Sequence, residues 1–289
     1  MTVILGLAGA LAYGFADFLG GFASRRVPPI VVTAWVAVIG LAPLLLGLAL
    51  LGGRFTPAAL LWGVVAGLSG SVGVLMLYTA LAIGPMSVLS PLTSVIAAVV
   101  PIAAGVIFVG SQLTGIGIAA IVAATVAVVL VGIVRDRSGA RLTGRGLAAA
   151  GIAGCGFGGL ILAYSATSPD DGLAPLVVAR VVQSVVMWAG VGIATLRAGG
   201  AFKAMPPTRG TWLLIAVGGV LDASANVFIQ AALHSGDVAV ALPIVSVLNA
   251  LYPIGTIVLA AVVLRERLTA VQIAGLALAL AASAVLASL

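Results

Sequence analysis

Long runs of apolar residues, separated by short breaks, extend along the whole sequence. A helix that crosses the hydrocarbon core of a bilayer needs about 20 consecutive apolar residues. The stretch from Phe55 to Val134 contains no charged residue and is long enough for three such helices, with breaks at Gly84-Pro85 and Gly110-Ser111-Gln112. The same pattern over the whole chain predicts ten helices, at about 2–22, 30–51, 58–82, 86–109, 113–134, 146–165, 173–197, 210–233, 238–262 and 269–288.

Composition places these helices in a membrane. Of the 289 residues, 63% are hydrophobic and only 7% are charged, whereas a soluble domain carries roughly 25% charged residues. The single cysteine, Cys155, lies in an apolar segment, so the sequence offers neither a disulfide framework nor a cysteine metal site. We therefore expect an all-α integral membrane protein with ten transmembrane helices and no bound metal.

The second half of the chain repeats the first. One constant shift along the sequence aligns Pro91 with Pro243 and Pro101 with Pro253. Shared hydrophobicity alone is the weaker explanation, because prolines coincide as well as leucines. Five helices per copy is an odd number, so the second copy enters the membrane from the opposite side, as in the inverted repeats of many secondary transporters. The expected organisation is one integrated membrane domain with a first repeat at 1–134, a basic linker at 135–145 and a second repeat at 146–289.

Three motifs resemble a known family. The run Ala80-Leu81-x-x-Gly84 recurs as Ala232-Leu233-x-x-Gly236, and each copy is followed by the two aligned prolines. The runs Leu264-Arg265-Glu266-Arg267-Leu268-Thr269 and Ala12-Tyr13-Gly14-Phe15-Ala16-Asp17-Phe18 are also similar to segments of that family. The chain thus resembles the EamA-type ten-helix transporters of the drug/metabolite transporter superfamily. The resemblance implies a proton-linked or facilitative carrier of small metabolites, often an exporter.

Ionisable side chains within the predicted spans mark a candidate site. Such side chains cost several kcal/mol in hydrocarbon, so each should face a cavity or a partner. Asp222, Asn226 and Gln230 follow one another at every fourth position and therefore share one helix face. Asp17 and Arg180 lie in other predicted spans. The candidate substrate-binding or coupling residues are Tyr13, Asp17, Trp35, Tyr78, Ser94, Arg180, Gln183, Asp222, Asn226, Gln230, Ser246, Asn249 and Tyr252.

Two interpretations of Arg180 stay open at this point. Its guanidinium could attract an anionic group of the substrate, or it could neutralise one aspartate as a buried ion pair. The stripe that contains Asp222 and Asn226 favours the lining of a cavity, since an ion pair alone would not need it. Either Asp222 or Asp17 is a candidate for a change of protonation during transport.

Proline positions suggest where the helices could bend. Pro91, Pro101, Pro243 and Pro253 each remove a helical hydrogen bond. They are candidate hinges for alternating access, and the competing interpretation is that they only kink packed helices.

The sequence contains no motif for ATP hydrolysis or for catalysis. A phosphate-binding loop is glycine-rich and ends in lysine, but the one lysine, Lys203, lies in Ala-Phe-Lys-Ala. The single histidine, His234, is too few for a metalloprotease motif. We therefore expect secondary transport, no enzymatic activity and no cofactor.

Basic residues predict the orientation. The net charge of +6 would suggest nucleic-acid binding in a soluble protein, but here all basic residues except Arg54 and Arg180 fall in loops on one side. The positive-inside rule then places both termini outside, whereas the family resemblance implies cytoplasmic termini.

The predicted function is secondary active transport across the plasma membrane by alternating access, with export favoured over uptake and protons as one candidate coupling ion. The substrate is a small polar or amphipathic metabolite. A non-transporting polytopic scaffold or sensor is the alternative. The expected partners are the substrate and membrane lipids, without nucleic acid; a monomer is expected to suffice, with a homo-oligomer as the alternative.

Overall fold

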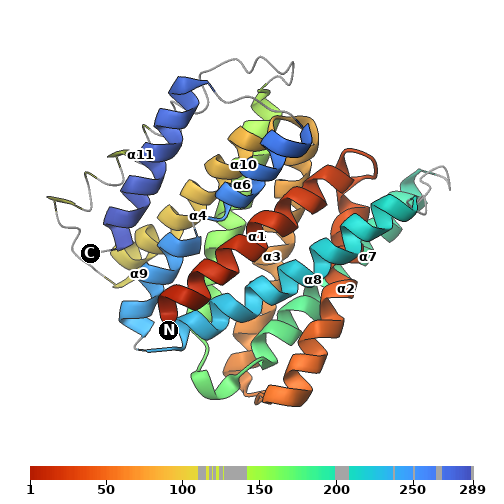
Figure 1. The fold of residues 1–289 in the computed structure, drawn as a ribbon. Coiled ribbons are helices and arrows are strands. Elements are labelled where there is room, and N and C mark those ends of the chain that lie inside the picture. The colour runs from red at the N-terminus through yellow and green to blue at the C-terminus, as the bar shows by residue number, and fades with distance from the viewer. Residues whose placement is uncertain are drawn as a thin grey trace.

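The computed structural model describes residues 1–109, 142–198, 208–236, 238–249, 251–264 and 269–287, with a few positions between 115 and 126. All regular elements in these ranges are helical (Figure 1). The predicted helix at 113–134 and most of the predicted linker at 135–145 lie outside the described residues.

Six of the described helices are long and apolar enough to cross a membrane. They are α1 (Thr2–Ser24), α2 (Pro29–Leu51), α3 (Pro57–Ile83), α6 (Gly144–Ser165), α7 (Ala174–Arg197) and α8 (Arg209–Leu233). The other helices are α4 (Met86–Val109), the 3₁₀ turn η1 (Pro169–Asp171), α9 (Val238–Asn249), α10 (Pro253–Leu259), the π-helical turn η2 (Ala260–Leu264) and α11 (Ala270–Ala287). Each predicted span in the described ranges has a helix at its place.

Threonines fix where three of the spans begin. The hydroxyls of Thr56, Thr143 and Thr208 accept hydrogen bonds from backbone N–H groups in the first turns of α3, α6 and α8, at 3.1, 3.1 and 3.4 Å. Such caps satisfy an N–H group that has no partner within its own helix. The boundaries therefore follow directly from the sequence.

The prediction of one continuous helix at 238–262 is wrong. The chain turns at Leu251-Tyr252, between α9 and α10, and continues through η2 to Leu264. Pro253 has no N–H to donate, so it cannot make the helical hydrogen bond to the Asn249 carbonyl. The Asn249 carbonyl instead accepts from the Tyr252 N–H at 3.0 Å, a three-residue bond of the 3₁₀ type.

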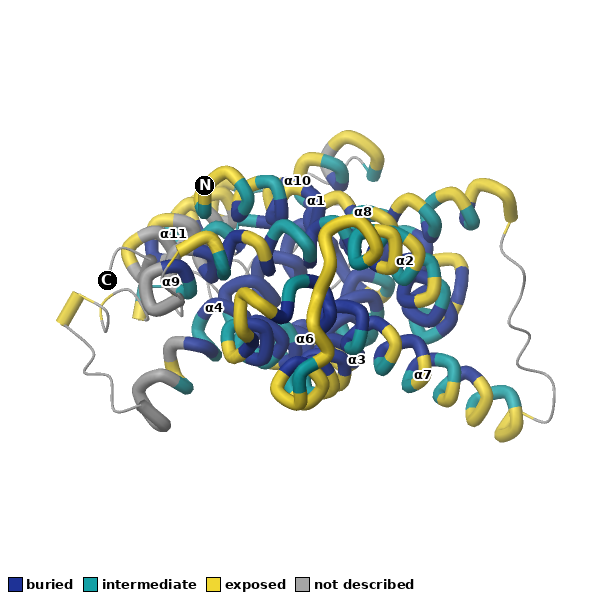
Figure 2. The backbone as a smooth tube through the Cα atoms, turned by 90° about the horizontal axis from the view of Figure 1, so that it is seen from below, coloured by how far each residue is buried: buried dark blue, intermediate teal, exposed yellow. Residues whose placement is uncertain are grey.

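The helices pack in a pattern that joins the two halves of the chain. Helix α3 packs against α6 and α7, α8 packs against α1 and α2, and α4 packs against α6. Helix α1 also contacts α9 and α10. Buried positions lie in the centre of this bundle and exposed ones on its outer surface (Figure 2).

Close backbone approaches require glycine at two crossings. A Cβ added to Gly14 of α1 would lie 2.2 Å from the Tyr252 carbonyl oxygen at the start of α10. A Cβ on Gly156 of α6 would lie 2.6 Å from the Gly73 nitrogen of α3. Small residues at helix interfaces allow such contacts and compensate in lipid for the lack of a hydrophobic driving force between helices.

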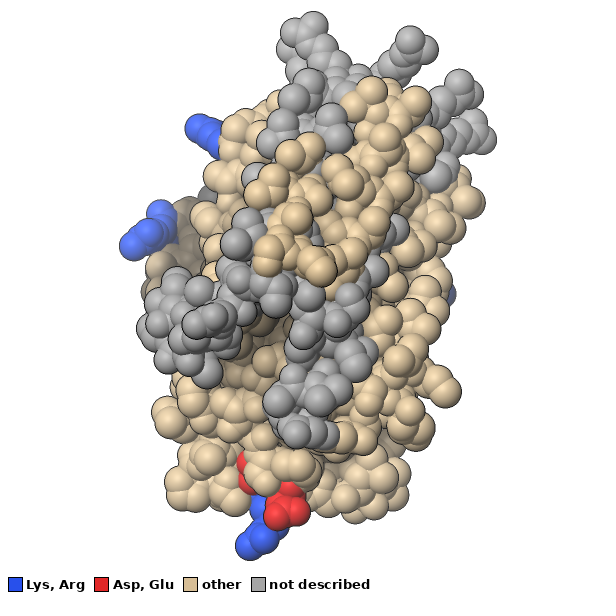
Figure 3. Space-filling model, turned by 90° about the vertical axis from the view of Figure 1, so that its left-hand side faces the viewer, with Lys and Arg blue, Asp and Glu red and all other residues tan. Residues whose placement is uncertain are grey.

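Polar contacts tie the loops together at each end of the bundle. At one end, Asp171 accepts hydrogen bonds from the Thr56 hydroxyl at 2.8 Å and from the Ser168 N–H at 2.9 Å. The Arg54 N–H donates to the Asp171 carbonyl at 3.2 Å. At this end Figure 3 shows acidic and basic side chains together. At the other end, the Arg25 guanidinium donates to two carbonyls at the C-terminus of α3, both at 3.2 Å.

Candidate functional site

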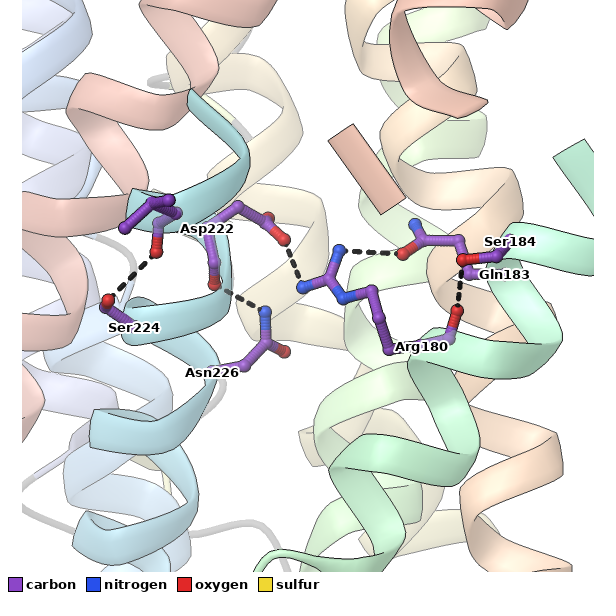
Figure 4. A network of polar contacts seen from close by, with 7 residues as sticks. Arg180, Gln183, Ser184, Asp222, Ser224 and Asn226 are labelled. Carbon is purple, nitrogen blue, oxygen red and sulfur yellow. Dashed lines mark hydrogen bonds and ion pairs between the residues drawn. The ribbon is translucent and has the colours of Figure 1, made fainter. Parts of the chain in front are cut away.

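A buried ion pair joins α7 to α8 (Figure 4). The Arg180 Nη2 donates to Asp222 Oδ2, and the two residues are 5% and 3% exposed. Arg180 Nη1 donates to Gln183 Oε1 at 2.8 Å. The Ser184 hydroxyl donates to the Arg180 carbonyl, and the Asn226 amide donates to the Asp222 carbonyl, both at 2.8 Å. The structure thus contains the contact that the ion-pair interpretation of Arg180 requires.

A pocket lies beside this pair, and we call it the ion-pair pocket. Its cavity volume is about 20 Å³, which is room for about one or two water molecules. Its polar wall is formed by Arg180, Gln183, Asp222 and Asn226. The rest of the wall comes from α1, α3 and α6, in the form of Tyr13, Ala66, Gly67, Gly70, Val74, Phe157, Leu160 and Tyr164, with Ala179 of α7. Both halves of the chain therefore build it.

A second pocket, which we call the Asp17 pocket, has a cavity volume of about 10 Å³, which is room for about one water molecule. Asp17 is 4% exposed and lines this pocket. Asn249 is 6% exposed, and its Oδ1 has no hydrogen-bond partner among the described residues. The other lining residues are Tyr13, Phe157, Leu160, Ile161, Ile229 and Tyr252.

The two pockets adjoin. Tyr13, Phe157 and Leu160 line both of them, so the two spaces share these side chains as walls. The Tyr252 hydroxyl donates to the Ser90 carbonyl at 3.3 Å, which ties the turn between α9 and α10 to α4. A molecule that reaches one pocket is therefore close to the charges of the other.

The polar stripe of α8 is longer than predicted. Gln230 donates through Nε2 to the Thr167 hydroxyl at 3.0 Å, while its buried Oε1 has no partner among the described residues. His234 continues the four-residue spacing, and its Nε2 lies 3.1 Å from the Thr167 carbonyl. Burial lowers the pKa of the His234 imidazole, against opposing effects of the Thr167 hydrogen bond and the Asp171 carboxylate. The stripe runs from the ion pair to the end of α8.

Several predicted site residues line neither pocket. The hydroxyls of Ser94 and Ser246 donate to carbonyls of their own helices at 2.9 and 2.7 Å. Tyr78 is buried against Gly20, and its hydroxyl has no hydrogen-bond partner among the described residues. Trp35 packs edge-to-face against two other tryptophans, with ring centroids 5.1 and 4.6 Å apart.

The predicted hinge prolines have different surroundings. Pro91 and Pro101 lie inside the continuous helix α4, and Pro243 lies within α9. Pro253 is the first residue of α10, directly after the turn. Only the last of the four therefore coincides with a break in a helix, and hinge motion at all four remains a prediction.

Sequence reasoning missed the contribution of α6. Phe157, Leu160, Ile161 and Tyr164 are spaced three and four residues apart and together line the two pockets. That spacing puts them on one helix face. The spacing of these four residues is visible in the sequence, but their shared face carries a single hydroxyl group, that of Tyr164. A face with so little polarity does not stand out among apolar membrane helices.

The comparisons with known proteins identify the family. The model of the EamA-like transporter family matches residues 1–133 and 173–288. The chain belongs to this family. The family lies within the drug/metabolite transporter superfamily, so the resemblance inferred from the sequence motifs is confirmed. The protein is thus a multi-pass membrane transporter of this type.

Solved structures share the fold of this EamA-like transporter. A crystal structure matches with a TM-score of 0.67 and 17% sequence identity, over 98% of this chain and 95% of that one. No curated protein sequence matches the transporter. Within the described residues, no three His, Cys, Asp or Glu side chains are grouped to hold a metal ion.

Proposed function

We propose that this transporter is a secondary carrier of small polar or amphipathic metabolites that works by alternating access, with ten helices in two inverted five-helix repeats. The observation that carries the proposal is a pair of adjoining buried pockets with charged walls, at the contact between the two halves of the chain. Secondary carriers with inverted repeats bind substrate at this place.

The packing pattern supports the inverted repeat. In that arrangement α1, α2 and α3 correspond to α6, α7 and α8. Helix α3 packs against α6 just as α8 packs against α1, and α3 packs against α7 just as α8 packs against α2. If the two halves of the chain are exchanged, the same helix contacts result. We propose a first repeat at 1–134, a linker at 135–145 and a second repeat at 146–289.

Unsatisfied polar groups favour a carrier over a scaffold or sensor. A sealed scaffold should pair its buried polar groups with each other, because an unpaired one costs free energy. Arg180 and Asp222 are paired in this way, but Asn249 Oδ1 and Gln230 Oε1 have no hydrogen-bond partner in the described part of the chain. These groups are available to a ligand or to water.

The charges at the two ends support an orientation. Arg25, Arg26, Arg145, Arg197 and Arg209 lie at the ends of helices that meet on one side of the bundle. The positive-inside rule makes that side cytoplasmic and both termini external. We propose a carrier of the plasma membrane that has this orientation and exports its substrate. An ion gradient or a substrate gradient drives transport, and protons are one candidate ion. The carrier has no enzymatic activity, and the monomer is its working unit.

Release of metabolites from liposomes tests the function. Purified transporter is reconstituted into liposomes loaded with a water-soluble metabolite extract, without ATP, and released compounds are identified by mass spectrometry. A limited set of compounds should leave faster than from protein-free liposomes, and Asp222→Asn or Asn226→Ala should slow them. If both variants release these compounds at the wild-type rate, the site is elsewhere. If nothing leaves faster than from protein-free liposomes, the protein is not a carrier.

A further inference from the structure

We infer that Thr167 and Arg25 are the centres of two gates, one at each end of the molecule, that hold two helix bundles together over the site. This inference rests on the proposed carrier function and specifies which parts move and which residues close the site. The observation behind it is that hydrogen bonds join the bundles at both ends, on either side of pockets with room for one or two water molecules.

Packing divides the described helices into two bundles. Helix α3 packs against α6 and α7, and α4 packs against α6, so we call these four helices the α3 bundle. Helix α8 packs against α1 and α2, and α1 packs against α9, so we call these four the α8 bundle (Figure 1). Each bundle contains helices from both halves of the chain. The contact between α2 and α7 joins the two bundles and provides a pivot.

Both pockets lie between the bundles. The ion pair crosses this boundary, because Arg180 belongs to the α3 bundle and Asp222 to the α8 bundle. The Asp17 pocket is lined by Phe157 from one bundle and by Tyr252 from the other side. Cavities of about 20 and 10 Å³ hold water and are too small for a metabolite. The bundles must therefore separate before a substrate can enter.

The first gate lies at the end of the bundle that carries Asp171. Thr167 directly follows α6, in the α3 bundle. From α8, Gln230 Nε2 donates to the Thr167 hydroxyl at 3.0 Å, and His234 Nε2 lies 3.1 Å from the Thr167 carbonyl oxygen. Thr167 and Gln230 are 5% and 2% exposed, so water competes little for their contact. We call this set of contacts the Thr167 gate.

The second gate lies at the opposite end. Arg25 directly follows α1, in the α8 bundle. Its Nε donates to the Leu81 carbonyl and its Nη2 to the Gly84 carbonyl, both at 3.2 Å, at the C-terminus of α3. Carbonyls at a helix C-terminus have no partner in their own helix and carry partial negative charge, so they attract a cation. We call this set of contacts the Arg25 gate.

The position of the gates accounts for alternating opening. Thr167 and Arg25 lie at opposite ends of the same boundary between bundles. A rocking movement about the contact of α2 with α7 that breaks one gate leaves the bundles joined at the other. The described structure, with both gates closed, is the intermediate that separates the two open forms.

Labelling of the pocket from each side tests the gates separately. Asn226→Cys, which lines the ion-pair pocket, is treated with a membrane-impermeant maleimide in a Cys155→Ser background, in sealed vesicles of each orientation. Thr167→Val keeps the shape and removes the hydroxyl acceptor, and Arg25→Met removes the guanidinium. Each should speed labelling from its own end at least about threefold and leave the opposite end unchanged. Asp170→Asn is the control, because Asp170 is an exposed carboxylate in η1.

A cross-link tests the Thr167 gate in transport. Thr167→Cys/His234→Cys is joined by a short bifunctional methanethiosulfonate, again without Cys155, and reconstituted for the metabolite-release assay. The cross-linked protein should release metabolites at least about tenfold more slowly than the same protein after reduction. Thr2→Cys/Ser235→Cys is the matched control, because these hydroxyls lie 2.5 Å apart at the same end but both in the α8 bundle. Its cross-link should change release by less than about twofold.

The outcomes separate the gates from the carrier function. Unchanged labelling in both variants, or faster labelling from both ends in either one, would overturn the gates, since a variant that merely loosens the fold exposes the pocket everywhere. Release that continues after the Thr167–His234 cross-link would overturn the Thr167 gate and leave the carrier standing. One-sided labelling as expected, without metabolite release by any form of the protein, would refute the carrier and leave the gates.

Discussion

Replacement of Asp222 by asparagine should destabilise the transporter strongly. In the native structure the Arg180 guanidinium has two side-chain acceptors, Asp222 Oδ2 and Gln183 Oε1. Asp222→Asn keeps the size of the side chain and removes the charge. Arg180, which is 5% exposed, is then left as a buried cation whose side-chain acceptors in the described part of the chain are neutral amides.

Two independent magnitudes apply to this change. Removal of one partner from a buried ion pair costs about 3–5 kcal/mol. An uncompensated arginine costs about 2.5–3.5 kcal/mol at the centre of a membrane helix on insertion scales, which is an upper value for Arg180, the seventh residue of α7. The two ranges meet near 3 kcal/mol, which is more than a hundredfold change in the folding equilibrium, at about 1.4 kcal/mol per tenfold.

The loss of stability is measured as thermal unfolding in detergent, followed by tryptophan fluorescence. Trp35, Trp188 and Trp212 form one cluster, so their fluorescence reports on the packing of α2, α7 and α8. Asp222→Asn should lower the midpoint clearly, and the exposed control Asp170→Asn should not.

The double variant Arg180→Met/Asp222→Leu distinguishes structure from transport. An apolar pair of similar volume often replaces a buried ion pair without loss of stability. The double variant should therefore regain most of the stability that the single variant loses and still fail to release metabolites. A single variant as stable as the wild type would refute the buried pair, and full transport by the double variant would refute its role in the site.

Three other predictions concern packing, pH and topology. Gly14→Ala should lower the unfolding midpoint, at an overpacking cost of about 1–3 kcal/mol, because its Cβ would meet a backbone carbonyl; Gly192→Ala, with nothing within 4 Å, should not. The pKa of His234 is lower in the folded protein than in the unfolded chain, so the unfolded chain binds the proton first as the pH falls. The wild type should therefore lose stability relative to His234→Gln below about pH 6.5. Parallel stability curves of the two proteins from pH 8 to 5 would contradict this. A C-terminal alkaline phosphatase fusion should be active in cells; an inactive one, with a fluorescent C-terminal fusion, would reverse the orientation.

Much of the fold could be predicted because its boundaries are local. Threonine caps, glycines and prolines bound the apolar runs, and the described spans begin and end within a few residues of the expected positions. The break between α9 and α10 depends on more than the sequence around it. Pro91 and Pro101 lie inside a continuous helix, while Pro253 follows a turn that is packed against Gly14 of α1. Nothing near Pro253 in the sequence reveals that approach.

The charged and polar residues of the candidate site could be predicted from the sequence. That they line two separate pockets could not. Spacing along α7 and α8 predicted the stripe of Arg180, Gln183, Asp222 and Asn226, which share the ion-pair pocket. That Asp17 lies in a separate pocket follows from how α1, α6 and the turn after α9 pack together. Such contacts between distant segments leave no periodic signal in one sequence.

Solvent access to Asn226 tests the central claim, a substrate site that opens to both sides of the membrane. In a Cys155→Ser background, Asn226→Cys is treated with a membrane-impermeant maleimide in sealed vesicles of each orientation. An alternating-access carrier predicts labelling from either side, because the site that Asn226 lines opens to each face in turn. Labelling from only one side, or from neither, would contradict the account.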